Sequence, residues 1–258
     1  MRSAPVTPDG DLIRWIELPG CGGPAAGPAR VYVHGLGASS PAYYTEAALH
    51  PLLADRRSLL VDLLGFGLSD RPAGFDYTLE SHADALAAVI TAAGAEGAEL
   101  VAHSMGGAIA IVLAARHPGL VSRLVLVDSN LDPVPLPGPP GGGSSGIASF
   151  GEEEFLAGGW EQVRDAVSPH WWSTMRLAGR VGLHRSAVHL ARGTAPTMRE
   201  LLLTLDLPRT FLFPAQDGAL PGEEALRASG VTVVAVPDCG HNIMLDSPDA
   251  FAHAVAAA

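Results

Sequence analysis

The chain of 258 residues has no lysine, only two cysteines and no long hydrophobic run. Without lysine there is no Schiff-base lysine for pyridoxal-phosphate chemistry and no phosphate-loop lysine for Walker-type nucleotide hydrolysis. No apolar run reaches the roughly 18 residues of a membrane-spanning helix. Cys21 and Cys239 could pair, but two cysteines fit a reduced cytoplasmic protein equally well.

Net charge and hydrophobic content further limit the possible partners and the class of protein. The formal net charge of −11 argues against nucleic acid or an anionic membrane surface as a partner. Because 48% of the residues are hydrophobic, the chain can bury a large core. The first 15 residues hold no apolar segment of the secretory type. We therefore expect a soluble cytoplasmic protein, a monomer or a homodimer, with no cofactor and no metal site.

Short apolar runs alternate with longer amphipathic or alanine-rich segments. This alternation is typical of an α/β fold with a mostly parallel central sheet flanked by helices. Several runs are continuous stretches of valine and leucine, as expected for strands covered on both faces. The expected strands are 12–18, 30–34, 58–63, 99–104, 123–128, 209–213 and 231–236, and the expected helices are 41–54, 78–94, 105–117, 221–229 and 248–257.

The alternation stops between residues 131 and 205. A stretch rich in proline, glycine and serine at 133–146 is typical of a hinge or mobile loop, and helix-like segments without a strand follow it. Long insertions of this kind in compact domains are usually functional. We expect a core formed by 1–130 and 206–258, with a helical cap or lid at 131–205 inserted before the penultimate strand.

Ser104 stands where an expected strand passes directly into an expected helix. Such a junction forces a strained turn that exposes the serine and requires small residues two positions before and after it. Ala102 and Gly106 meet this requirement. The backbone N–H of Met105 would then face a developing oxyanion, as a nucleophilic serine requires.

The segment "VYVHGLGASS" at 31–40 ends an apolar strand in a glycine-rich turn. A serine hydrolase needs a second oxyanion donor from a loop after an earlier strand, and the N–H of Leu36 is placed to supply it. We expect His34 to brace this loop through hydrogen bonds rather than to act in catalysis. Gly35 and His103, beside the proposed donors and nucleophile, are further candidate substrate contacts.

A histidine and an aspartate follow Ser104 on later strand ends. His241 lies after the last strand, on the edge where open α/β sheets bind ligands. Asp217 follows the penultimate strand, and Asp128 ends the strand before it. Both carboxylates satisfy the chain order Ser, Asp, His. We rank Asp217 first as the acid that orients His241, with Asp128 as the competitor.

Five segments in order resemble the α/β-hydrolase superfamily over essentially the whole chain: "VHGLGASS", "VDLLGFGLSDRP", "AHSMGG", "FPAQDGALP" and "PDCGHNIMLDSPDAF". They are most similar to small esterases, haloperoxidase-like proteins and C–C hydrolases with a helical cap. The resemblance implies an α/β-hydrolase fold, with Ser104 as nucleophile, Asp217 as acid and His241 as base. Serine at the nucleophile position sets the chain apart from haloalkane dehalogenases and epoxide hydrolases, which place aspartate there.

The function expected from these residues is cleavage of a carboxylic ester, lactone or thioester of a hydrophobic small molecule through an acyl-enzyme. Trp171, Trp172 and Met175 in the cap either face this substrate or pack the lid. The same pocket would serve C–C bond hydrolysis, a biosynthetic lyase or cyclase, or a ligand-binding receptor. The sequence leaves these alternatives open.

Overall fold

The computed structural model describes residues 1–23, 27–136 and 143–258, so the hinge expected at 133–146 lies partly outside the described residues. Eight strands form one sheet in the order β1-β2-β4-β3-β5-β6-β7-β8, in which β3 to β8 run parallel and β1 and β2 are antiparallel. This agrees with the fold class expected from the sequence. The strands are β1 (Arg2–Pro5), β2 (Leu12–Leu18), β3 (Arg30–Val33), β4 (Ser58–Asp62), β5 (Ala98–His103), β6 (Val121–Val127), β7 (Arg209–Pro214) and β8 (Val231–Val236).

Strand β1 is the one strand of this sheet that the sequence pattern did not indicate. It has only four residues, three of them exposed, and it pairs with β2 at the edge of the sheet. A four-residue edge strand in which Ala4 is the single buried residue is too short to show an alternating apolar pattern. Pairing with a neighbour, rather than its own composition, makes this segment a strand.

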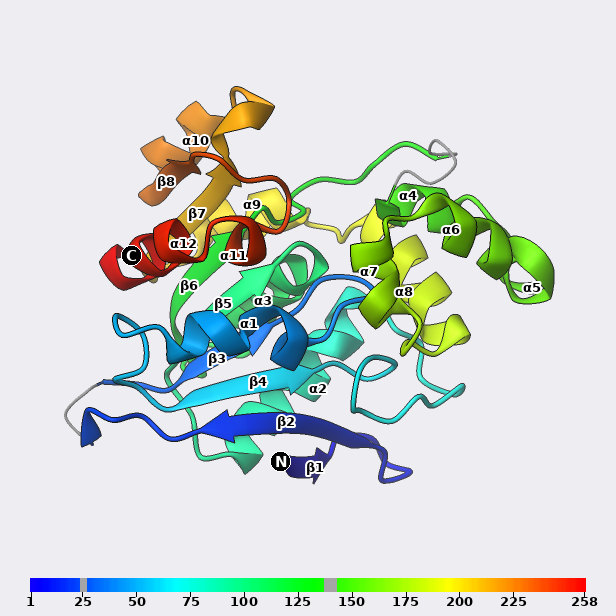
Figure 1. Cartoon of the computed structure of the whole chain (residues 1–258), viewed down its shortest axis with the longest axis horizontal. Coiled ribbons are helices and arrows are strands. Elements are labelled where there is room, and N and C mark those ends of the chain that lie inside the picture. The colour runs from blue at the N-terminus through cyan, green and yellow to red at the C-terminus, as the bar shows by residue number, and fades with distance from the viewer. Residues whose placement is uncertain (24–26, 137–142) are drawn as a thin grey trace.

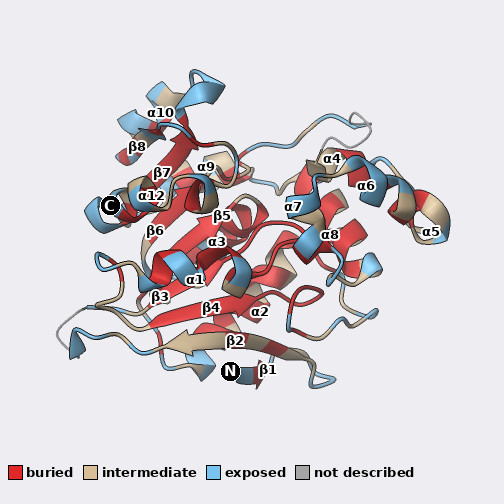
Figure 2. Ribbon diagram, in the orientation of Figure 1, coloured by how far each residue is buried: buried red, intermediate tan, exposed pale blue. Residues whose placement is uncertain are grey.

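The central strands are buried on both faces because side chains alternate along a strand. In β3, Val31 and Val33 enter one core while Tyr32, between them, enters the other. Figure 2 shows these inner strands as buried and the outer surfaces of the surrounding helices as exposed. The continuous apolar runs of the sequence therefore mark strands that lie between two helical layers.

Helices cover both faces of the sheet (Figure 1). Helices α2, α3 and α10 contribute to one core, and α1, α11 and α12 to the other. Among the described residues, no helix is long and apolar enough to cross a membrane. The bounds are α1 (Ser40–Leu49), α2 (Leu79–Ala92), α3 (Met105–Arg116), α10 (Glu223–Ala228), α11 (Ile243–Asp246) and α12 (Pro248–Ala257).

A helical insertion separates β6 from β7, within the range expected to form a cap. Figure 1 shows its helices α4 to α8 grouped together at one end of the sheet, whereas α9 packs against α3 of the core. The insertion consists of α4 (Gly143–Ala148), α5 (Glu152–Glu154), the π-helical turn Phe155–Gly159, α6 (Trp160–Ala166), α7 (Pro169–Met175), α8 (Arg180–Arg192) and α9 (Met198–Thr204).

A buried charge cluster joins the start of β3 to β5. The side chains of Arg30 and Glu99 are 3% and 1% exposed, and Arg30 Nε lies 2.6 Å from Glu99 Oε1. Arg56 and Arg123 approach the other carboxylate oxygen at 3.2 and 3.3 Å. Removing one partner of such a pair leaves the other charge buried without compensation.

Glu99→Gln is therefore expected to lower the free energy of unfolding by about 3 to 5 kcal/mol, measured by urea denaturation. The matched control is Glu223→Gln, because Glu223 also pairs with an arginine, at 2.8 Å, but on the surface of α10. An exposed pair contributes less than about 1 kcal/mol. Equal effects of the two substitutions would show that burial of the Glu99 cluster has no energetic consequence.

Candidate active site

Ser104 occupies the turn between β5 and α3, as the sequence indicates. Its φ of 53° and ψ of −122° lie outside the usual regions for a side-chain-bearing residue, which shows a strained backbone. The turn is closed by small residues. Ala102 is fully buried, and a Cβ atom on Gly106 would lie 2.5 Å from the backbone oxygen of His34. A larger residue at either position would push the turn away from β3.

The turn Gly35–Ala38, called here the 35–38 turn, lies beside Ser104. A Cβ atom on Gly35 would be 3.0 Å from Ser104 Cβ, so a larger residue at this position would crowd the nucleophile turn. Within the described residues, neither the N–H of Leu36 nor that of Met105 donates a hydrogen bond to the protein. Two backbone donors near Ser104 are therefore available to an oxyanion.

His34 supports this region instead of entering the site. Its Nε2 accepts a hydrogen bond from the Leu63 N–H at 3.0 Å, which leaves Nδ1–H to donate to the Gly35 carbonyl at 2.7 Å. The ring is completely buried, and burial lowers its pKa although Asp62 acts in the opposite direction. A neutral ring that makes two hydrogen bonds to the backbone fits the bracing role expected for His34 from the sequence.

His241 Nδ1 lies 2.6 Å from Asp128 Oδ2. This contact corrects the sequence-based ranking, because the carboxylate at His241 is Asp128 and not Asp217. Asp217 is exposed in a short 3-10 helix after β7, and its carboxylate forms no hydrogen bond or ion pair with any residue that the structure describes. The Asp128 contact fixes the proton of His241 on Nδ1 and leaves Nε2 as the basic nitrogen.

Sheet order explains why Asp128 takes this place. Strand β6 pairs with β5, so its carboxyl end lies beside the end of β5 at which Ser104 stands, whereas β7 is one strand further away. Asp128 follows β6 directly, and its backbone N–H donates to the Leu212 carbonyl at 2.8 Å. Its φ of 41° turns the chain out of the strand at this residue. Chain order could not distinguish the two aspartates, because both follow Ser104 and precede His241.

Asn130 is a site residue that the sequence analysis missed. Ser104 Oγ donates to Asn130 Oδ1 at 3.3 Å, and both residues line the same cavity. No hydrogen bond joins Ser104 to His241 in the part of the chain that the structure describes, although His241 lines this cavity too. The segment "VDSN" could have indicated Asn130 as a candidate site residue, because it places Asn130 two residues after Asp128 at the same strand end.

His103 connects the nucleophile turn to the histidine loop. Its Nε2–H donates to the His241 carbonyl at 2.9 Å, and the two rings lie 4.4 Å apart between centroids. Burial, reinforced by the nearby His241, holds the pKa of His103 well below its ordinary value. A neutral His103 keeps this proton on Nε2, so it holds the loop without adding charge beside the His241 ring.

The site cavity has a volume of about 420 Å³ and is formed by both the core and the helical insertion. None of its described lining residues is Arg, Asp or Glu, and its only histidines are His103 and His241. The ranges 24–26 and 137–142 hold only proline, alanine and glycine, so they add no charged side chain. The lining residues are Gly35, Leu36, Ala38, Tyr43, His103, Ser104, Asn130, Gly143, Ser144, Ala166, Val167, Ser168, Trp171, Leu190, His241 and Asn242.

The three candidate cap residues lie in different surroundings. Trp171 lines the cavity, as do the candidate contacts Gly35 and His103. Trp172 packs its ring against Trp160, with centroids 5.2 Å apart, and Met175 is fully buried. Trp171 is therefore positioned to face a substrate, whereas Trp172 and Met175 have packing roles.

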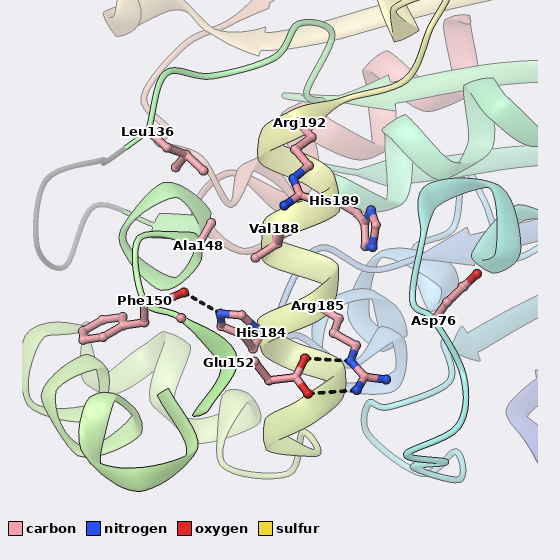
Figure 3. Close-up of a pocket in the computed structure, with 11 residues that line it drawn as sticks. Asp76, Leu136, Ala148, Phe150, Glu152, His184, Arg185, Val188, His189 and Arg192 are labelled. Carbon is pink, nitrogen blue, oxygen red and sulfur yellow. Dashed lines mark hydrogen bonds and ion pairs between the residues drawn. The ribbon is translucent and has the colours of Figure 1, made fainter. Parts of the chain in front are cut away.

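A second cavity of about 470 Å³ lies along α8 (Figure 3). Arg185 pairs with both carboxylate oxygens of Glu152 at 2.8 Å, and His184 Nε2–H donates to the Phe150 carbonyl at 2.8 Å. The described lining of this cavity contains no serine, threonine or cysteine. No cluster of three metal-ligating side chains occurs in the described ranges. These polar groups hold the insertion together and do not form a nucleophilic site.

Comparison with known proteins was made at the levels of family, sequence and structure. A family model described as the alpha/beta hydrolase fold matches residues 30–230, which is more than half of the chain. An esterase from Exiguobacterium antarcticum has a similar structure, with a TM-score of 0.78 over 100% of this chain and 98% of that one at 20% sequence identity. At this identity the structural likeness shows the fold alone.

Two curated relatives match a shorter segment. A 2-hydroxymuconate semialdehyde hydrolase from Pseudomonas sp. (strain CF600) is 42% identical over 105 residues, which cover 40% of this chain and 37% of that protein. A probable lysophospholipase, BODYGUARD 3 of Arabidopsis thaliana, is 39% identical over 109 residues, which cover 41% of this chain and 22% of that protein. The chain thus spans well under half the length of these relatives.

Proposed function

The chain belongs to the α/β-hydrolase family, and from this premise we propose that it hydrolyses an uncharged ester of a hydrophobic small molecule through an acyl-enzyme on Ser104. One observation carries the proposal. Ser104, on a strained turn, lines the same cavity as His241, and His241 Nδ1 lies 2.6 Å from Asp128. Nucleophile, base and orienting acid are the three parts that acyl transfer to serine requires.

In the acylation step, Ser104 Oγ forms a bond to the ester carbonyl carbon while His241 Nε2 takes the hydroxyl proton. The N–H groups of Leu36 and Met105 stabilise the negative charge that develops on the carbonyl oxygen, each contributing about 3 kcal/mol. Asp128 stabilises the imidazolium without taking its proton. The tetrahedral intermediate then breaks its carbon–oxygen bond to the alcohol, which leaves with the proton held by His241.

Deacylation repeats these steps with water in place of serine. His241 Nε2 takes a proton from water as the water oxygen attacks the acyl carbon. Collapse of the second intermediate breaks the bond to Ser104 Oγ and returns the proton to it, which releases the carboxylic acid. Asn130, which holds the Ser104 hydroxyl in the free protein at 3.3 Å, must release it before attack.

The charge of the cavity supports an uncharged substrate. A substrate carboxylate would lose its hydration in a site whose described lining holds no arginine, and this loss is costly without a paired charge. The apolar side chains of Leu36, Val167, Trp171 and Leu190 suit a hydrophobic acyl or alcohol group. We take the helical insertion to act as the cap over this substrate.

C–C bond hydrolysis is the second candidate, and one finding favours it. The relative that is 42% identical over 105 residues is a 2-hydroxymuconate semialdehyde hydrolase, and such a substrate is acidic. The described lining of the cavity holds no arginine or lysine to match a substrate carboxylate. For this reason we place ester hydrolysis first, with C–C hydrolysis as the competing outcome of the same assay.

The test compares two chromogenic esters with the same acyl chain length. We expect kcat/KM for p-nitrophenyl pentanoate to exceed that for mono-p-nitrophenyl glutarate at least about tenfold, because only the second carries a carboxylate into the cavity. An uncharged fluorophosphonate should label the wild-type protein. Turnover of 2-hydroxymuconate semialdehyde without turnover of neutral esters would favour the second candidate. Absence of labelling, together with no turnover of a broad ester panel or of 2-hydroxymuconate semialdehyde, would refute both candidates.

A further inference from the structure

A side chain of the helical insertion is bonded to the turn that carries one of the proposed oxyanion donors. The indole Nε1–H of Trp171, on α7, donates to the carbonyl oxygen of Leu36 at 2.9 Å. The two residues are 135 positions apart in the chain. The acceptor belongs to Leu36, the same residue whose N–H donates to no acceptor among the described residues and can therefore stabilise an oxyanion. This contact links the cap to the proposed catalytic turn directly.

The geometry of the 35–38 turn shows how this contact can restrain the turn conformation. The Ala38 N–H donates to the Gly35 carbonyl at 3.2 Å, and Gly37 has a φ of 68°, the positive value of the third residue in a type II turn. Type I and type II turns differ by a flip of the central peptide, which here joins Leu36 to Gly37. The direction of the Leu36 carbonyl therefore differs between the two turn types, and the Trp171 indole holds it in the type II direction. The proposed oxyanion donor, the Leu36 N–H, belongs to the preceding peptide, so the indole acts on this donor by restraining Leu36, the residue between the two peptides.

The indole itself is held firmly. The backbone N–H of Trp171 donates to Ser168 Oγ at 3.2 Å at the start of α7. At the other end of the helix, Met175 is fully buried. A Cβ atom on Gly37 would lie 2.9 Å from Trp171 Nε1 and 3.0 Å from Met175 Cγ, so α7 packs on the bare backbone of the turn. The position of the Trp171 indole N–H is therefore determined by the packing of the whole helix α7 against the turn.

We propose that Trp171 is a positioning residue that holds the 35–38 turn in its oxyanion-binding conformation and so couples the seating of the cap to catalysis. This inference rests on the proposed function, because it assigns the Leu36 N–H to the oxyanion. Trp171 acts through the turn backbone, although its ring also lines the cavity. A substrate that displaces α7 would remove the indole from Leu36 and weaken the oxyanion site together with it.

The test is Trp171→Phe, which keeps an aromatic ring but removes the N–H donor. The matched control is Trp172→Phe, the same substitution one residue later on the same helix, where the ring packs against Trp160. Loss of a whole oxyanion donor lowers kcat about 10²- to 10³-fold. Because Trp171→Phe leaves the Leu36 N–H present but less firmly oriented, we expect kcat for p-nitrophenyl pentanoate to fall roughly tenfold. KM should change little, and Trp172→Phe should keep near wild-type kcat.

A spectroscopic readout separates positioning from packing. In an acyl-enzyme, hydrogen bonds from the oxyanion donors lower the stretching frequency of the acyl carbonyl, which difference infrared spectroscopy with a ¹³C-labelled acyl group detects. Trp171→Phe should shift this band to higher frequency, and Trp172→Phe should leave it unchanged. Thermal unfolding of both variants checks that α7 remains folded.

The outcomes distinguish the inference from the function on which it rests. If wild-type protein forms no acyl-enzyme, the proposed function fails. If wild-type protein acylates but Trp171→Phe changes only KM, Trp171 merely contacts substrate and the inference is overturned. Equal losses of kcat in the two variants, with an unshifted carbonyl band, would also overturn it, because the effect would then be one of cap packing.

Discussion

Asp128→Asn is expected to lower kcat for ester hydrolysis about 10⁴-fold, since an amide at this position no longer fixes the proton of the histidine on Nδ1. Asp128 Oδ2 lies 2.6 Å from His241 Nδ1, so the substitution changes the partner of the ring without removing atoms that pack. An amide N–H facing Nδ1 favours the tautomer with its proton on Nε2, and that tautomer cannot take a proton from Ser104. Steady-state kinetics with p-nitrophenyl pentanoate measures the effect.

Asp217→Asn is the matched control for this substitution. Asp217 is also an aspartate after a parallel strand, but it is exposed and its carboxylate forms no hydrogen bond or ion pair with the residues that the structure describes. We expect kcat within about twofold of wild type, as for a surface substitution that changes stability by less than about 0.5 kcal/mol. The reverse result, with collapse in Asp217→Asn and normal activity in Asp128→Asn, would overturn the assignment of the acid.

Ser104→Ala is expected to lower kcat roughly 10⁶-fold and to abolish fluorophosphonate labelling, because no other group in the turn can form the acyl-enzyme. Alanine keeps the small volume at the turn, so the fold should be retained. The measurements are ester turnover, labelling followed by mass spectrometry of the modified peptide, and thermal unfolding.

Ser173→Ala provides the control for labelling, since Ser173 is an exposed serine of α7 whose hydroxyl donates to the His170 carbonyl at 2.6 Å. It should be labelled and active like the wild type. Mapping of the label to a serine other than Ser104, or ester turnover that survives Ser104→Ala with unchanged kcat, would contradict the acyl-enzyme proposal.

Local sequence patterns were sufficient for most elements of the core. The expected strands 12–18 and 231–236 coincide with β2 and β8, in which buried residues are spaced by more exposed ones, as side chains that alternate between two faces require. The turn at Ser104 was equally predictable, since its strain demands small neighbours that are adjacent in the chain. Strand β1 escaped prediction because pairing at the sheet edge, rather than its own composition, makes it a strand.

By itself, then, the sequence determined the α/β architecture, the position of Ser104 and the candidacy of His241, all of which depend on residues close together in the chain. Only the tertiary structure decided which aspartate meets His241, because the answer depends on β6 lying beside β5 in the sheet. It also decided that the Trp171 indole reaches the Leu36 carbonyl, a contact between residues 135 positions apart. Such contacts are set by how elements pack across the fold, and no local pattern of residue types encodes them.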